Sequence, residues 1–228
     1  MGFPQSGLPP APGGNSPMTQ GPQPGQVYLK QLGIWVDMQS WTQEPIYDTE
    51  IITTPVAAGS EVIFFRDPAF PTGVRKDLRH TNMVSQQQLP SGWKATIYQM
   101  SVKVLFLETA AGSGLFTTPE DALRLYYQGV ARFVTGNQKL EKEAPLIFWP
   151  SPLGITGNVE RTGVALSSFG TVNNGIPSLS ATIPLELPIE LSNELTFEGR
   201  IRFPAALTLD NDTQIQFTLH TYMSKPLR

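Results

Sequence analysis

The side chains that most often carry out chemistry are scarce in this chain. There is no cysteine, and the only two histidines, His80 and His220, lie far apart in the sequence. A metal centre built on imidazole or thiolate needs several such ligands close together. We therefore expect no metal centre, no thiol nucleophile and no disulfide. His220 alternates with Phe217 and Leu219 in an extended segment, so we expect it to face solvent or an interface.

Carboxylates offer a second kind of chemistry, because glycoside hydrolysis needs only two of them. Four glutamates recur at four-residue intervals late in the chain, namely Glu186, Glu190, Glu194 and Glu198. In an extended strand Glu186 and Glu190 would share one face, which is also the pattern of a solvent-facing strand. A glycoside hydrolase therefore stays open as a third interpretation, behind the two given below.

Other catalytic signatures are incomplete. The chain lacks the G-x-S-x-G sequence of many serine hydrolases. Residues 112–114 (GSG) have neither the lysine nor the spacing of a phosphate-binding loop. Residues 210–213 (DNDT) resemble part of a calcium loop without its spacing, and they predict a tight turn. We expect no catalytic residues, no cofactor and no small-molecule substrate.

The most basic stretch of the chain is residues 75–82, RKDLRHTN. Guanidinium groups pair well with carboxylates and phosphates, so this stretch would suit an inter-subunit salt bridge or a phosphate contact. The alternative is a solvated loop in which Asp77 pairs locally with Arg75 or Lys76. The candidate subunit contacts in this stretch are Arg75, Lys76, Arg79 and His80.

The charge of the whole chain points away from nucleic acids. The net charge is −3, and only 15% of the residues are charged. A nucleic-acid-binding domain normally presents a clustered basic face, so we expect no specific nucleic-acid binding. A polar surface with few charges suits packing against other subunits. The chain shows neither a signal-peptide pattern nor an apolar run of about 20 residues, which predicts a soluble protein made in the cytoplasm.

The first 26 residues have a composition of their own. They contain 13 prolines and glycines and no charged side chain. Such a segment buries too little apolar surface to fold alone, and proline favours extended polyproline II. We expect residues 1–26 to be a disordered or extended arm and residues 27–228 to be the folded domain. Candidate subunit contacts in the arm are Pro9, Pro10, Pro22 and Pro24.

Short apolar segments separated by turn residues fill most of the remaining chain, which is the pattern of β-strands. The best of them, residues 95–107, is long enough to predict a bulge near Met100 and Ser101. The last, residues 213–222, alternates cleanly between apolar and polar side chains. About eight strands are expected in all, at residues 26–36, 45–53, 61–66, 95–107, 145–149, 181–191, 195–203 and 213–222.

One helix is expected among these strands, from Pro119 to Thr135. Thr118 suits the N-cap, proline suits the first helical position, and the two acidic residues that follow favour the positive end of the helix dipole. Apolar side chains then recur at spacings of three and four residues. Gly136 suits the end of the helix.

These elements predict an all-β protein, specifically a single jelly-roll β-sandwich of about eight strands with one inserted helix and an N-terminal arm. The regular alternation of strands and helices that a parallel α/β sheet requires is absent.

Several segments together resemble a known family. They are DLRHTNMVSQQQL at residues 77–89 with the following PSGW, the strand at 97–107, ATIPLELPIEL at 181–191, and LTFEGRIRFPAALTL at 195–209, closed by the last strand. The pattern resembles the single jelly-roll capsid proteins of tailless icosahedral double-stranded DNA phages. The resemblance implies a structural coat protein that self-assembles into an icosahedral shell in the host cytoplasm through barrel-to-barrel contacts and arm exchange.

The same resemblance implies other partners as well. Copies of the same chain and other coat proteins would share the virion, and an internal membrane beneath the shell would fit this type of capsid. The rival interpretation comes from a different class. Trp35, Trp41, Trp93 and Trp149 would provide the exposed aromatic surface of a carbohydrate-binding β-sandwich module, in which sugar rings stack on indole side chains.

Overall fold

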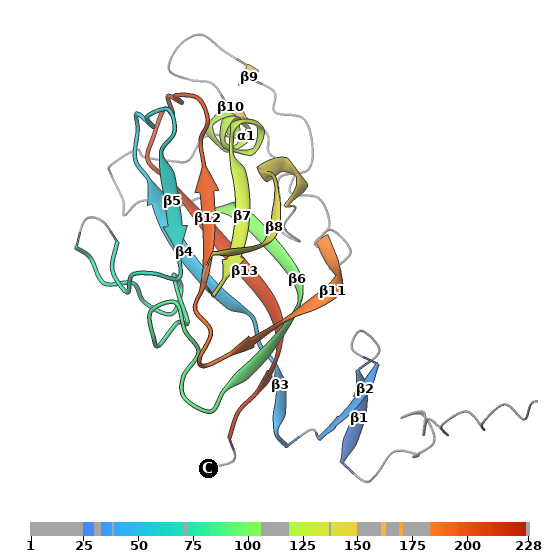
Figure 1. The fold of residues 1–228 in the computed structure, drawn as a ribbon. Coiled ribbons are helices and arrows are strands. Elements are labelled where there is room, and N and C mark those ends of the chain that lie inside the picture. Colours follow the sequence, from blue (N-terminus) through green and yellow to red (C-terminus); the bar gives the residue numbers. More distant parts are fainter. Residues whose placement is uncertain are drawn as a thin grey trace, which may run out of the picture.

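The computed structural model describes residues 25–29, 33–37, 39–70, 73–105, 119–136, 138–149, 161–162, 169–170 and 183–226. Within these ranges the fold is all-β, as the sequence predicts, and strands in antiparallel sheets form most of it (Figure 1). The helices of the described residues are α1, Pro119–Gln128, and a short 3₁₀ helix η2, Leu146–Phe148. No described helix has the length and apolar character needed to cross a membrane.

The first of two large sheets has β13 at its centre. One edge of β13 pairs with β6, which pairs in turn with β11. The other edge is shared by two short strands, because β4 pairs with the first half of β13 and β3 pairs with its last residues. The strands of this first sheet are β3 (Trp41–Gln43), β4 (Ile46–Ile52), β6 (Lys94–Leu105), β11 (Ile183–Ser192) and β13 (Thr213–Ser224).

The second sheet lies in front of the first in Figure 1 and has the order β5-β12-β7-β8. Its strands are β5 (Glu61–Phe64), β7 (Val130–Thr135), β8 (Lys139–Pro145) and β12 (Phe197–Arg202). Two smaller sheets are separate hairpin-like pairs, β1 (Gln26–Leu29) with β2 (Ile34–Asp37), and β9 (Arg161–Thr162) with β10 (Phe169–Gly170).

The hydrophobic core lies between the two large sheets and is rich in aromatic rings. Phe217 of β13 is its centre, with ring centroids 5.6 Å from Phe64, 6.4 Å from Phe133 and 5.4 Å from Trp149. Phe64 and Phe133 belong to the second sheet, so these contacts hold the two sheets face to face. Aromatic pairs at such separations stabilise a core beyond the area they bury.

Gly199 of β12 lets the two sheets approach at this point. A Cβ atom at this position would lie 2.8 Å from Cδ2 of Phe217, which is closer than real side chains come. The missing side chain is therefore a packing requirement of the core and not a turn signal.

The expected helix is about half correct, and its second half is wrong. It begins at Pro119 as predicted, but it ends at Gln128, and residues 130–135 form strand β7 instead. Gly129 separates the two elements, and a Cβ atom there would lie 2.9 Å from the carbonyl oxygen of Leu125. The sequence VARFVT is rich in β-branched residues and buries Ala131, Phe133 and Thr135 by alternation, a pattern that overrode the helical spacing.

Two strand predictions also need correction. Of the strand predicted at residues 145–149, only Pro145 lies in a strand, as the end of β8, and Leu146–Phe148 form η2. Leu146 and Trp149 are buried in the hydrophobic core. Residues 26–36 do not form one strand, because the chain turns at Gly33, which has a φ of 66° and separates β1 from β2. Strands β3, β7 and β8 were not predicted as strands.

The bulge expected near Met100 and Ser101 lies at Tyr98 instead. His220 of β13 pairs with Gln99 of β6 and the next residue, Thr221, pairs with Ile97, so Tyr98 is the extra residue. The expected arm, residues 1–26, lies outside the described residues up to position 24, while Gln26 already belongs to β1.

Candidate assembly surfaces and a buried charge cluster

The basic stretch predicted as a subunit contact forms a loop whose charges pair largely with one another. The Asp77 carboxylate accepts hydrogen bonds from Nε and Nη2 of Arg79 at 3.0 and 2.7 Å, and it lies 2.8 Å from Nδ1 of His80. The hydrogen bonds from the Arg79 side chain lower the pKa of Asp77 to about 2. The local partners of Asp77 are therefore Arg79 and His80, and not Arg75 or Lys76 as the sequence suggested.

The four basic candidates of this loop are not equivalent. Arg75 and Arg79 are exposed, and His80 lies half-buried with its ring edge against Phe70. Lys76 is a correction to the sequence prediction, because its side chain is completely buried and points into the protein. Its ammonium group binds carboxylates of the same chain, so it is not available at the surface for a neighbouring subunit.

Lys76 is the centre of a buried charge cluster with Asp48 and Glu50. Its Nζ atom lies 3.0 Å from Oδ1 and 3.1 Å from Oδ2 of Asp48, and it also hydrogen-bonds Oε1 of Glu50. The exposed fractions of the Lys76, Asp48 and Glu50 side chains are 0%, 1% and 8%. One ammonium and two carboxylates are thus enclosed together, where ions need a close partner.

The cluster forms because β4 turns two acidic residues towards the space between the sheets. Asp48 pairs with Phe217 and Glu50 pairs with Ile215 of β13, and these partners face the core. Lys76 enters from the loop that follows β5. Its backbone N–H donates to the carbonyl oxygen of Pro68 in the same loop at 2.9 Å. Further along the loop, the Thr81 hydroxyl donates to the carbonyl oxygen of Tyr47 at 3.1 Å, which holds the loop against β4.

Phe65, directly after β5, completes the cluster with a backbone hydrogen bond. Its N–H donates to Oδ2 of Asp48 at 2.6 Å. The residue has a φ of 67°, a left-handed conformation that is costly for a residue with a side chain. The hydrogen bond to the carboxylate and the burial of the Phe65 ring in the core offset that cost.

Burial changes the acidity of both carboxyl groups in the cluster. It raises the pKa of Glu50 to about 7, because desolvation outweighs the hydrogen bond and the attraction from Lys76. Burial raises the pKa of Asp48 as well, against the opposing effects of Lys76 and the Phe65 amide. Each carboxyl therefore holds a proton more readily than an exposed one does.

Asp48 and Glu50 were not predicted from the sequence as functional residues, although the pattern of residues 46–52 points to them. In residues 46–52 (IYDTEII) the side chains at 46, 48, 50 and 52 share a face, and the two ends of that set are isoleucines. Acidic residues between core isoleucines require a buried cation. Lys76, the least conspicuous member of the basic stretch, supplies it.

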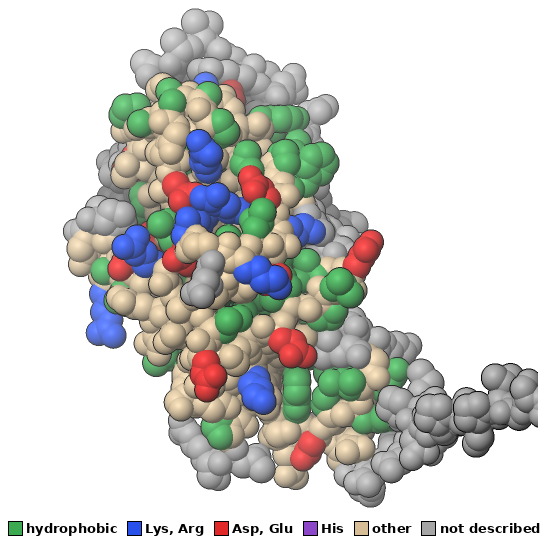
Figure 2. Space-filling view, viewed as in Figure 1, with side chains coloured by type: hydrophobic (Ala, Val, Ile, Leu, Met, Phe, Trp, Pro, Cys, Tyr) green, Lys and Arg blue, Asp and Glu red, His purple; other side chains and the backbone are tan. Residues whose placement is uncertain are grey.

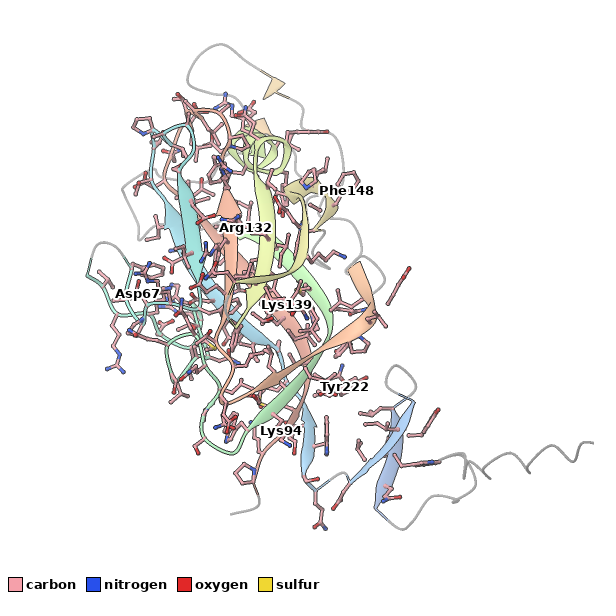
Figure 3. The ribbon with its side chains drawn as sticks, viewed as in Figure 1. Asp67, Lys94, Arg132, Lys139, Phe148 and Tyr222 are labelled. Atoms are coloured by element: carbon pink, nitrogen blue, oxygen red, sulfur yellow. The ribbon has the colours of Figure 1, made fainter. Side chains whose placement is uncertain are left out.

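A second charge cluster lies on the outer face of the second sheet, where Figure 2 shows basic and acidic side chains gathered together. Glu61 of β5 bonds Arg132 of β7 and lies 3.4 Å from Nη1 of Arg200 of β12. Arg200 also donates to Glu198 through Nε at 2.6 Å. We call Glu61, Arg132, Glu198 and Arg200 the outer-face network. Arg132 projects from β7 towards the viewer's side of the sheet in Figure 3.

Exposed apolar side chains on the described surface lie in the loop after β5, as Val74, Leu78 and Val84, and at three further places. The β1–β2 hairpin exposes Val27, Ile34 and Trp35, and it lies at the lower end of the molecule beside β3 (Figure 1). At the opposite end, α1 contacts η2, and these two helices expose three side chains, Tyr127 (70%), Ile147 (43%) and Phe148 (61%). Figure 3 shows Phe148 at this end.

The third place is the sandwich edge formed by β8 and β11. Leu140 of β8 is 51% exposed and Leu187 of β11 is 83% exposed. Between these strands lies an open groove of about 600 Å³, lined by Leu187, Pro188, Ile189 and Leu195 together with charged side chains of Lys139 and Glu141. We call this the edge groove. It presents apolar side chains next to the sides of β8 and β11 that pair with no other strand of the described residues.

A further groove, of about 650 Å³, crosses the outer face of the first sheet, and Ile34, Trp41, Lys94 and Glu190 are among the residues that line it. Tyr222 of β13 pairs with Thr96 at its border, and the Tyr222 ring lies 4.7 Å from that of Tyr98. We call this the aromatic groove. Lys94 and Tyr222 mark its region at the lower end of the molecule in Figure 3.

The four tryptophans do not form one surface. Trp149 is fully buried in the core, and Trp93 is half-buried, with the ammonium of Lys225 over its ring at 4.5 Å. Trp35 packs against Tyr28 in the hairpin, with ring centroids 5.2 Å apart and ring planes tilted by 51°, and Trp41 lines the aromatic groove.

The four glutamates are also separated. Glu186 and Glu190 belong to β11 of the first sheet, whereas Glu198 belongs to β12 of the second, where Arg200 and Gln87 bind it. His220 is half-buried, and its Nε2 lies 3.1 Å from Oγ of Ser101. Burial, with a smaller contribution from Lys103, lowers the pKa of His220.

Within the described part of the chain, no three His, Asp or Glu side chains are grouped as metal ligands would be. The arm candidates Pro9, Pro10, Pro22 and Pro24 lie outside the described residues. Comparison of the chain with known proteins found no match among family models, curated proteins or solved structures.

Proposed function

We propose that this chain is a structural coat protein with a single jelly-roll fold, which self-assembles into an icosahedral shell. The observation that carries the proposal is the strand order. One sheet runs β4-β13-β6-β11 and the facing sheet runs β5-β12-β7-β8. When these eight strands are numbered 1 to 8 in chain order, from β4 to β13 and without β3, β9 and β10, the first sheet has the order 1-8-3-6 and the second has the order 2-7-4-5. Two nested Greek keys produce this order, and jelly rolls of this kind occur in viral capsid proteins and in lectins.

The distribution of apolar surface supports assembly. The β1–β2 hairpin, the α1–η2 end and the edge groove each expose large apolar side chains on a different side of the sandwich. Single exposed apolar residues are ordinary, but clusters at several sites suit a subunit that meets several neighbours. A two-stranded hairpin is only marginally stable alone, so the β1–β2 pair gains most from a neighbour that covers it.

The first test is the mass of the full-length protein in solution. Light scattering after size-exclusion chromatography, with negative-stain imaging of the same fractions, should give trimers, pentamers, hexamers or shells. Replacing Ile147 and Phe148 together by serine should weaken that association, because it removes two of the three exposed apolar side chains of the α1–η2 end. Val84→Ser is a matched control, since Val84 is 81% exposed but belongs to none of the three clusters. A monomer under every salt and pH condition contradicts the proposal.

The arm is tested separately. If residues 1–24 tie subunits together, a protein that lacks them should fold but fail to form particles. Unchanged particle formation would show that the arm has no part in assembly.

In the virion this subunit would contact copies of itself, other coat proteins and a membrane beneath the shell.

A carbohydrate-binding module is the second candidate, and one observation favours it. Trp41, Tyr98 and Tyr222 present aromatic rings in or beside the aromatic groove, as a sugar-stacking site requires. Glycan-array binding that Trp41→Ala abolishes, by a protein that remains monomeric, would favour this function over the coat protein.

A further inference from the structure

The contacts of the buried charge cluster suit a covalent reaction between two of its members. Lys76 Nζ is nearly equidistant from the two oxygens of Asp48, at 3.0 and 3.1 Å, so the amine lies next to the carboxyl group that carries the carbon Cγ. Reacting atoms held at about 3–3.5 Å react as though at very high concentration. The fold therefore encloses an amine and a carboxyl group within hydrogen-bond distance of each other, away from water.

We propose that Lys76 and Asp48 condense to form an intramolecular isopeptide bond, with Glu50 as the group that transfers the protons. This inference does not depend on the proposed coat function, because it concerns only the interior of one subunit.

The reaction is a dehydration and needs no oxidant or cofactor. Lys76 Nζ gives one proton to the Glu50 carboxylate, and its freed lone pair forms the N–C bond to Cγ of Asp48. Glu50 passes that proton to one Asp48 oxygen, then accepts a second proton from the nitrogen and delivers it to the same oxygen. The C–O bond breaks, and one water leaves. An ammonium and a carboxylate become a neutral amide, and Glu50 is a carboxylate again.

Glu50 is in place for this role, since its Oε1 already accepts a hydrogen bond from Lys76 Nζ. A group that shuttles protons works best when its pKa lies near the working pH. Burial raises the pKa of Glu50 to about 7, so the carboxylate can take a proton and return it near neutrality.

The backbone supplies the stabilisation that an acyl-transfer step needs. The Phe65 N–H donates to Oδ2 of Asp48 at 2.6 Å, and Oδ2 is where negative charge would develop once Nζ attacks Cγ. The donor is fixed by the left-handed conformation of Phe65, so it requires no rearrangement during the reaction.

The surroundings favour the neutral product. The side chains of Lys76 and Asp48 are 0% and 1% exposed, and the Phe70 ring lies 5.5 Å from the ammonium. Two ions in such a site lose their hydration, whereas an amide carries no net charge. A cavity of about 50 Å³ borders Asp48 and is lined in part by Phe65 and Thr81, which is room enough for the released water.

The isopeptide bond would cross-link the loop between β5 and β6 to strand β4. It would join β4, at the edge of the first sheet, to the loop that carries the exposed Arg75 and Arg79. The chain has no cysteine, so a disulfide cannot do this. An amide also survives reducing conditions, unlike a disulfide.

The test is the intact mass of the full-length protein, measured after unfolding. The expected result is a mass lower by one water than the sequence requires, once the initiator methionine is allowed for. Protease digestion should then yield a branched peptide that joins the segment around residue 48 to the segment around residue 76. A full sequence mass after prolonged incubation of the folded protein overturns the proposal, as does a lost water that maps to any other pair of residues.

Variants separate the roles of the three side chains. Lys76→Arg keeps the positive charge but removes the amine, and it should restore the full mass. Glu50→Gln should keep the shape of the site and slow or abolish the loss of water. Lys225→Arg is the matched control, because Lys225 also pairs with a glutamate, Glu44, but at the surface. The control should lose one water as the wild type does.

If Lys76→Arg fails to fold, Asp48→Asn provides an independent measurement. Its side chain would release ammonia in place of water when Lys76 attacks, so the mass should fall by one ammonia. A wild-type mass deficit that persists in a folded Lys76→Arg protein would overturn the assignment.

Discussion

The protein contains two clusters in which basic side chains bind carboxylates, and the two clusters differ in their surroundings. The cluster of Asp48, Glu50 and Lys76 is enclosed between a strand edge and a loop, with side chains at most 8% exposed. The outer-face network lies on the solvent side of the second sheet, where the side chains of Glu61 and Arg132 are 23% and 30% exposed.

The difference shows that the contribution of an ion pair to folding stability depends on how deeply the pair is buried. Nearer the surface, where these side chains are 15–30% exposed, water screens part of each charge, and a pair adds less to stability. In the interior, each ion depends on its partner, because the unpaired charge has no water to replace it. The buried cluster therefore fixes one conformation of the Lys76 loop, whereas the outer-face network tolerates change.

The largest expected effect comes from removing the buried cation. Lys76→Met leaves Asp48 and Glu50 without a counter-charge and should lower the free energy of unfolding by about 3–5 kcal/mol. Arg132→Met, the matched change in the outer-face network, should cost less than about 1 kcal/mol. Urea denaturation of both variants checks this. Equal losses would show that the two clusters do not differ as described.

The second effect concerns pH. The folded protein raises the pKa of Glu50 from its usual 4.5 to about 7, so between these values the folded state binds a proton that the unfolded state has released. Stability should therefore decrease as pH rises through this range, by up to about 3 kcal/mol.

Thermal denaturation from pH 4.5 to pH 7, compared between wild type and Glu50→Gln, measures this contribution. The variant should show a flatter dependence. A wild-type curve that rises over this range with the same slope as the variant would contradict the assignment. Asp77 provides a comparison with an exposed carboxyl group. Because its pKa is lowered to about 2, any contribution of Asp77 to folding stability is lost only at strongly acidic pH, outside the range of this experiment.

A third effect sharpens the comparison within one strand. Gly199 lies between Glu198 and Arg200 of the outer-face network, but its own position faces the core, and a Cβ atom there would meet the Phe217 ring. Gly199→Ala should therefore cost about 1–3 kcal/mol by overpacking. Arg200→Met, one residue along, should cost less. Chemical denaturation measures the free energy of unfolding of both variants. A larger loss of stability in Arg200→Met than in Gly199→Ala would contradict this prediction.

The smallest effect is the coupling between Glu61 and Arg132 in the outer-face network. A double-mutant cycle with Glu61→Gln and Arg132→Met should give an interaction of about 0.2–1 kcal/mol. Salt should weaken this coupling, because the pair lies near solvent. A coupling that is large and independent of salt would place the pair with the buried cluster.

Much of the fold was readable from the sequence, for identifiable reasons. Strand β13 alternates cleanly, β6 is long and apolar, and Pro119 with two acidic residues marks the start of α1. Strand β8 was missed because its sequence, KLEKEAP, is mostly charged and lies at a sheet edge where little is buried. Strand β7 was predicted as helix because the spacing of its apolar residues fits both the helical period of about 3.6 residues and the strand period of two.

The buried cluster was harder to predict than the strands. The alternation of residues 46–52 places Asp48 and Glu50 on the core face, which local sequence reveals. Lys76 belongs to a run of basic residues that looks like ordinary surface, and only the path of the loop after β5 turns it inward. That path is a property of tertiary structure, so periodicity carries no sign of it.

The central position of β13 has a consequence for how the chain folds. Strands β3, β4 and β6 all pair with β13, which follows β4 by more than 150 residues in the sequence. While the chain emerges from the ribosome, these three strands must wait without their neighbour, with their pairing edges open. Pairings this distant in sequence make folding slow, on a timescale of about milliseconds to seconds. During that interval the chain is most exposed to association with other unfinished chains, before its own last strand closes the sheet.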